Sequence, residues 1–172
     1  MTDVGSALQA PERVAAVQRI LIELPSGGVL DRLTALAAEL LECPMAMLTL
    51  LEADRQRFVS SHGLPPEVRQ VGQTALDYCI CQHAVATRRP LVVGDTTIDP
   101  VLATNLAVTA LGVRAYAGIP LITSGGHALG TLCVLDVARR QWRNDHLALL
   151  SDLAGIVVDE LRRVTPNLSH LA

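Results

Sequence analysis

The chain has 172 residues, half of them hydrophobic, with only one Trp, two Tyr and one Phe, and its formal net charge is −3. This length predicts one domain, whose core must be built from Leu, Val, Ala and Ile because aromatic side chains are so few. The acidic balance and the lack of a base-stacking surface exclude a nucleic-acid-binding protein.

No apolar run reaches membrane-spanning length, and the N-terminus lacks the basic and apolar regions of a signal peptide. We therefore expect a cytoplasmic protein without a membrane partner. Its cysteines, Cys43, Cys79, Cys81 and Cys133, are then reduced thiols.

Apolar spacing of three or four residues and short apolar runs predict the elements of the first half of the chain. In chain order we expect a disordered lead-in (1–9), helices over 11–24 and 29–42, strands over 45–52 and 57–61, a loop over 64–74 and a helix over 75–88.

The second half is predicted in the same way. In chain order we expect a short strand (91–93), a polar loop (95–100), a short helix (101–111), a hairpin (112–136), a last helix starting at an Asn144 N-cap, and a tail (166–172). Residues 10–165 then form a single domain. This order predicts an α+β sandwich with a central antiparallel sheet of five or six strands. We expect the first, second and last helices on one face and the middle helices over a pocket on the other.

The hairpin carries the most information. Gly125-Gly126 suits a two-residue turn, which pairs Tyr116 with Leu135, Gly118 with Cys133, Pro120 with Thr131, Ile122 with Leu129 and Ser124 with His127. Alternation then gives one aliphatic face, which we interpret as core: Val113, Ala115, Ala117, Ile119 and Leu121. The other face mixes Arg114, Tyr116, Thr131 and Cys133, a combination typical of the floor of a ligand cavity.

Four segments resemble the GAF domain, a sensory module of bacterial signalling proteins: LLEADRQRFVSSHGL, CICQHAVATRRPLVVGDTTIDP, VLATNLAVTALG and the hairpin with GTLCVLDVARRQW. The resemblance covers residues 28–165 and implies the GAF/PAS-like fold, with its pocket under the middle helices. It does not specify the ligand. Relatives bind cyclic nucleotides, bilins, haem, nitrate, amino acids or nothing detectable, and a minority reduce free methionine sulfoxide.

The candidate ligand-binding residues are Tyr116, Arg114, Thr131, Cys133, Cys81, Asn105 and Asp95. If Arg114 reaches the cavity, its guanidinium favours an anionic ligand. The alternative is an ordinary Arg114–Asp95 ion pair at the sheet edge. Asn105 has two similar interpretations, as a pocket group or as a helix cap.

Cysteine chemistry is the other possibility. On a helix, Cys79 and Cys81 point in different directions, so they cannot ligate one ion together, although a four-cysteine iron–sulfur cluster is conceivable. We interpret them as buried small side chains, with Cys81 the better candidate for the pocket wall. Relatives that are reductases carry cysteines around the lid helix, where TTIDPVLATNLAV has none. Relatives that attach a bilin commonly use a Cys followed directly by His, whereas this chain has Cys81-Gln82-His83, and His83 is the only candidate for the axial ligand of a haem. We therefore expect no catalytic residues, no metal and no cofactor.

The leading hypothesis is a non-catalytic sensory module that binds an unknown small molecule and relays the signal to an effector domain or protein. The alternatives are a dimerisation module with a closed pocket and a thiol redox sensor or reductase. Three amphipathic terminal helices exceed the room on one sheet face, which predicts a homodimer through the first helix and the end of the last, near Leu161 and Val164.

Overall fold

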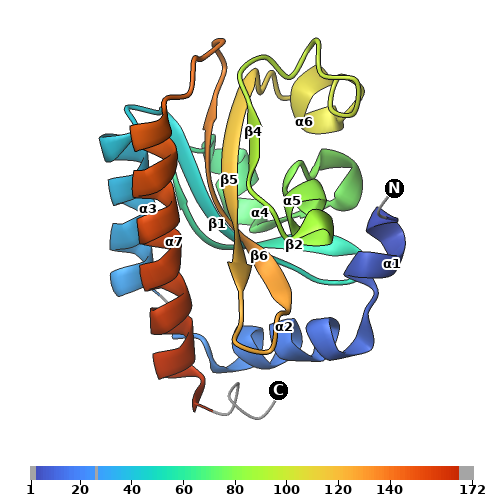
Figure 1. Ribbon diagram of the computed structural model, residues 1–172, viewed down its shortest axis with the longest axis vertical. Helices are drawn as coiled ribbons and strands as arrows, with labels where there is room; N and C mark the ends of the chain where they lie inside the picture. The colour runs from blue at the N-terminus through green and yellow to red at the C-terminus, as the bar shows by residue number, and fades with distance from the viewer. Residues whose placement is uncertain (1–2, 26, 167–172) are drawn as a thin grey trace.

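The computed structural model describes residues 3–25 and 27–166 and contains a six-stranded antiparallel sheet with helices on both faces (Figure 1). The strand order across the sheet is β3-β2-β1-β6-β5-β4. In chain order the strands are β1 (Met45–Leu51), β2 (Arg55–His62), β3 (Gln73–Ala75), β4 (Leu91–Val93), β5 (Ala115–Ile122) and β6 (Ala128–Asp136). The expected α+β architecture is confirmed.

The helices form two layers around this sheet. In chain order they are α1 (Val4–Leu8), α2 (Pro11–Glu23), α3 (Val29–Leu40), α4 (Pro66–Val71), the 3-10 helix η1 (Leu76–Tyr78), α5 (Cys81–Thr87), α6 (Leu106–Thr109) and α7 (Asn144–Val164). Helices α3 and α7 cover one face side by side, and α5 packs on the other with α1 beside it (Figure 1). None of the helices in the described residues is long and apolar enough to cross a bilayer.

Alternating side chains of the central strands divide the interior into two cores. Leu48 and Leu132 pack with α2, α3 and α7 in the first core, whereas Met47, Cys133 and Leu135 face α1 and α5 in the second. The second core contains the cavity described below.

The N-terminal lead-in is not disordered where the structure describes it. Residues 4–8 form α1, and the Leu8 side chain is 1% exposed. Arg13 holds this segment in place, because its buried guanidinium donates to the carbonyls of Leu8 and Leu51. Residues 1–2 and 167–172, the latter within the predicted tail, lie outside the described residues.

The predicted loop over 64–74 contains α4 and the start of β3. Pro66 is the first residue of α4, a position that favours proline, and Gly72, with φ +68°, ends the helix. The helix predicted over 75–88 begins only at Cys81, because residues 76–78 form η1 and Cys79 is extended. The argument from the helical phase of Cys79 and Cys81 was therefore wrong.

Two further helix boundaries differ from the prediction. The helix expected over 101–111 is confined to α6, although Gly112 does have the left-handed conformation expected after it, with φ +73°. The last helix does begin at Asn144, but the preceding Arg143 occupies the N-cap position.

The hairpin register is confirmed at Tyr116–Leu135, Gly118–Cys133 and Pro120–Thr131. It fails near the turn, where a bulge pairs Ile122 with Ala128 instead of Leu129. The turn is longer than two residues, because Gly126 N–H donates to the Thr123 carbonyl and Thr123 N–H donates to the His127 carbonyl. Only Gly126 of the glycine pair has a positive φ, +82°.

The first helix was expected to lie on one face of the sheet, but the corresponding helix α2 does not lie flat on that face. It crosses the end of the sheet beside the β5–β6 turn (Figure 1), where Glu12 Oε2 lies 3.8 Å from His127 Nε2. Ala16, Val17 and Ile20 of α2 are fully buried in the first core. Part of the apolar stripe of this helix is therefore covered within the chain, whereas Ile22 is 84% exposed.

Candidate functional site

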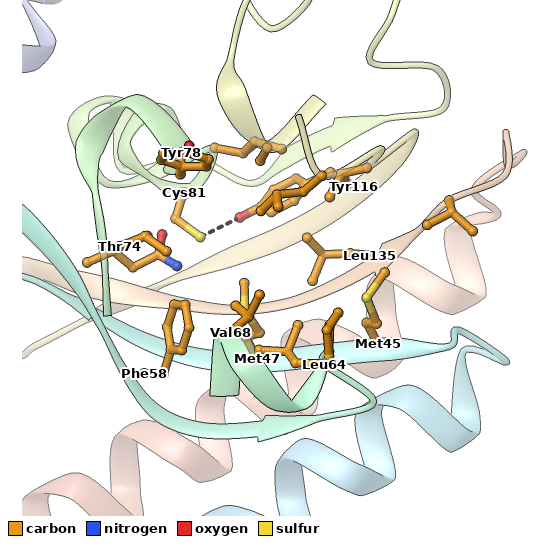
Figure 2. Close-up of a pocket in the computed structure, with 17 residues that line it drawn as sticks. Met45, Met47, Phe58, Leu64, Val68, Thr74, Tyr78, Cys81, Tyr116 and Leu135 are labelled. Carbon is orange, nitrogen blue, oxygen red and sulfur yellow. Dashed lines mark hydrogen bonds between the residues drawn. The ribbon is translucent and has the colours of Figure 1, made fainter. Parts of the chain in front are cut away.

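A cavity of about 150 Å³ lies between the sheet and helices α4, α5 and α6 (Figure 2). Its sheet side includes Met45, Met47, Phe58, Tyr116 and Leu135, and the covering segments contribute Leu64, Val68, Tyr78, Ile80, Cys81, Ala107 and Leu111. Val113 also lines it and belongs to the second core, so its assignment to the aliphatic face was wrong. None of the described residues that line this cavity is Asp, Glu, His, Lys or Arg.

Tyr116 is the largest fully buried side chain on this face. Its ring lies over Gly118 on the same strand, and a Cβ built on Gly118 would be 2.7 Å from Tyr116 Cζ. The glycine therefore makes room for the ring, and the ring forms part of the cavity wall. The Tyr116 hydroxyl donates to Cys81 Sγ at 3.2 Å (Figure 2), and burial raises the pKa of this phenol well above its ordinary value.

Three thiols gather beneath the cavity. Cys81 Sγ lies 4.0 Å from Cys133 Sγ and 3.7 Å from the Thr49 hydroxyl, which in turn lies 3.3 Å from the Thr131 hydroxyl. Hydrogen bonds from the Cys133 and Cys79 thiols hold the pKa of Cys81 well below its ordinary value. The Cys79 pKa is raised chiefly by burial and the Cys133 pKa chiefly by its hydrogen bond to Cys81. Cys81 is thus the first of the three to ionise.

Cys43 lies apart from this group, in the first core, where Arg140 Nη1 is 2.7 Å from its sulfur. The four-cysteine cluster left open by the sequence is therefore not assembled. Burial raises the pKa of Cys43 to about 11.

The structure brings four of the seven predicted ligand-binding residues together. Tyr116 and Cys81 line the cavity, and the buried side chains of Thr131 and Cys133 lie next to Cys81.

The other three predicted residues lie outside the cavity. Arg114 is nearly half exposed, and its Nη2 lies 3.3 Å from Asp95 Oδ2. This is the ordinary ion pair predicted from the sequence as the alternative to a cavity role. The Thr97 hydroxyl and then Arg114 lower the pKa of Asp95 to about 2. Asn105 caps α6 by accepting from Ala107 N–H. The argument for an anionic ligand, which required Arg114 in the cavity, is therefore wrong.

Sequence reasoning missed the side of the cavity built by β2, β3 and α4. Gln56 and Phe58 of β2 and Thr74 of β3 line it, as does Val68 of α4. Strand alternation offered a signal, since Gln56 and Phe58 are two residues apart and so share a face. The predicted strand began only at Arg57, which left Gln56 in the turn.

Comparison with known proteins identifies the fold as that of a sensory domain family. The GAF domain profile matches residues 27–161, and the chain belongs to this family. The GAF domain of an Acinetobacter phosphoenolpyruvate-protein phosphotransferase superposes with a TM-score of 0.65 at 15% identity, covering 90% of this chain and 95% of that one. A free methionine-R-sulfoxide reductase of Neisseria meningitidis superposes with a TM-score of 0.63 at 17% identity, covering 96% of this chain and 87% of that one.

Two curated relatives are much longer than this chain. A cyclic di-GMP phosphodiesterase of Pseudomonas aeruginosa is 33% identical over 140 residues, which cover 80% of this chain and 23% of the relative. A methyl sulfide methyltransferase-associated sensor of Methanosarcina acetivorans is 23% identical over 94% of this chain and 18% of its own length. The chain thus spans less than a quarter of either relative.

Proposed function

We propose that this chain is a cytoplasmic, non-catalytic sensory module that binds a small molecule in the cavity beneath α4, α5 and α6. The observation that carries the proposal is the cavity itself, about 150 Å³ in volume and walled by side chains of both the sheet and its covering helices. Membership of the GAF family and the sensor named among its relatives support it.

Strand β5 offers a route from the cavity to the terminal helices. Tyr116 faces the cavity, whereas its neighbour Ala117 belongs to the core formed with α3 and α7. Because α7 packs directly on β5, a ligand that shifts Tyr116 changes the surface on which α7 lies. The output would then pass from α7 to an effector domain or partner.

The composition of the cavity supports a non-catalytic role. Its walls carry no His, Asp, Glu, Lys or Arg side chain, so the groups that most often transfer protons in enzymes are missing from it. A bound molecule would meet mainly apolar surface, with Gln56, Thr74, Tyr78, Cys81 and Tyr116 as its polar contacts.

We also propose that the chain forms a homodimer through its terminal helices. Leu161 cannot contribute to this contact as predicted, because its side chain is 2% exposed. Leu36 and Leu40 of α3 and Leu149 and Ile156 of α7 are between 37% and 50% exposed and provide the apolar surface instead. Light scattering should give about twice the 18.3 kDa subunit mass, and a monomer at tens of micromolar would refute the dimer.

Native mass spectrometry of the gently purified chain tests the binding proposal. We expect a mass above 18.3 kDa that falls to the chain mass on denaturation. Val68→Phe, which narrows the cavity, should lose the added mass, whereas Val71→Phe on the exposed side of the same helix should keep it. An added mass that survives Val68→Phe unchanged would place the ligand elsewhere.

The thiol cluster favours a second candidate function, a peroxide-sensing thiol pair. Peroxide would oxidise the Cys81 thiol to a sulfenic acid with release of water, and the Cys133 thiol, 4.0 Å away, would displace a second water to form a disulfide. Peroxide treatment should then lower the chain mass by about 2 Da in the wild type but not in Cys133→Ser. An unchanged wild-type mass under oxidant would eliminate this candidate.

A further inference from the structure

Two polar atoms in the wall of the cavity lack a hydrogen-bond partner within the described residues. They are Gln56 Oε1 and Thr74 Oγ1, and both atoms are buried. The Gln56 residue is only 3% exposed. A buried amide or hydroxyl without a partner is unfavourable, so native proteins nearly always satisfy such groups.

The two groups lie close together because of the sheet register. Gln56 of β2 pairs directly with Thr74 of β3, and directly paired residues present their side chains on the same face. Figure 2 shows Thr74 at one end of the cavity with Phe58, away from Met45 and Leu135. The cavity therefore has a polar end and an apolar end.

The remainder of the wall restricts what can occupy this space. Among the described residues, no Asp, Glu, His, Lys or Arg side chain lines the cavity, so an ionic ligand would lose its hydration without gaining a carboxylate, ammonium or guanidinium as a counter-charge. Met45, at the apolar end, and Met47, also in the wall, supply flexible thioether side chains, which adapt to an apolar body of varied shape. A cavity of about 150 Å³ with mainly apolar walls has room for a molecule of the size of benzene.

We infer that the ligand of this site is a small uncharged molecule with an apolar body and one hydroxyl-like or amide-like group. Its polar group hydrogen-bonds to the Gln56 amide and the Thr74 hydroxyl, and its apolar body packs against Met45, Met47 and Leu135. This inference rests on the proposed sensory function and specifies the chemistry of the bound molecule.

Three probes with the same ring separate the possible ligand classes. Phenol is neutral with one hydroxyl, toluene is neutral without a polar group, and benzoate is charged at pH 7. Each is titrated into the 172-residue chain and followed by ¹H–¹⁵N NMR. We expect phenol to shift the amide signals of cavity residues with about tenfold higher affinity than toluene, since one hydrogen bond contributes a factor of this order. Benzoate should leave these signals unmoved.

Variants of the polar end connect this preference to the two side chains. Gln56→Leu and Thr74→Val should each reduce the preference for phenol over toluene while retaining toluene binding. Ser60→Ala is the matched control, because the buried Ser60 hydroxyl also has no hydrogen-bond partner among residues 3–25 and 27–166 but does not line the cavity. It should leave the preference unchanged. Removal of an unpaired polar atom should raise the melting temperature of all three variants, so the probe preference alone distinguishes ligand binding from a structural effect.

The possible failures are distinguishable. Equal binding of phenol and toluene, or tighter binding of benzoate in the cavity, would overturn the inferred ligand chemistry and leave the sensory proposal intact. If none of the probes binds and native mass spectrometry also detects only the 18.3 kDa chain, both the inference and the proposed function fail.

Discussion

The contact between Tyr116 and Gly118 is the structural feature of the cavity most open to measurement. The Tyr116 ring lies so close to Gly118 that a Cβ there would be 2.7 Å from Cζ and 2.8 Å from Cε1. Gly118→Ala should therefore push the ring off the strand and cost ~1–3 kcal/mol through overpacking. Tyr116→Ala should cost ~3–5 kcal/mol because it leaves a void in the second core.

The double variant gives the decisive measurement. Without the ring, an alanine at 118 meets no obstacle from residue 116, and alanine is ~0.5–1 kcal/mol better than glycine inside a strand. Gly118→Ala should then be neutral or stabilising in the Tyr116→Ala background. The interaction free energy between the two substitutions should be about 1–3 kcal/mol or more, and its sign should be opposite to that of the destabilisation caused by Gly118→Ala alone.

Urea unfolding of the four proteins, followed by circular dichroism, measures this interaction. Gly155→Ala is the control, because Gly155 lies on α7 with open space around its Cβ position. It should stabilise by ~0.5–1 kcal/mol, additively with Tyr116→Ala. If Gly118→Ala costs the same in both backgrounds, the ring does not occupy the space above Gly118 and our account of the cavity wall is wrong.

Three further predictions concern the scaffold. Arg13→Met should lower the free energy of unfolding by ~1.5–3 kcal/mol, because it deprives the Leu8 and Leu51 carbonyls of their charged donor; urea titration checks this, and an unchanged midpoint would contradict it. Gly130→Ala should lower the free energy of unfolding by ~3 kcal/mol or more, measured by thermal unfolding, since its Cβ would collide with the Thr49 backbone. A loss no larger than that caused by Gly118→Ala would show that the backbone of β1 moves to accommodate the methyl group. Asp95 has a folded pKa of about 2 against an ordinary 3.8, so its stabilisation is present above pH 3.8 and lost as the pH falls toward 2. The stability difference between wild type and Asp95→Asn should therefore shrink over that interval and stay flat from pH 5 to 7.

Local sequence patterns predicted much of the fold. The spacing of apolar residues located α2, α3 and α7 to within a few residues, because helical periodicity is a property of neighbouring positions. Strand alternation placed Tyr116 on the cavity face and Ala117 on the opposite one, for the same reason. The resemblance to GAF domains added the position of the cavity on the fold.

Tertiary structure decided which of these residues meet. The sequence offered both a cavity role and an ion pair for Arg114, and only the position of Asp95, 19 residues earlier, selected the pair. Gln56 and Thr74 are separated by α4 in the chain, and Cys81 and Cys133 by 52 residues, so no local period brings either pair together. Such contacts depend on the register of strands and on which helix covers them. For that reason the chain's own sequence defines the two faces of the sheet, whereas packing alone defines the chemistry of the cavity.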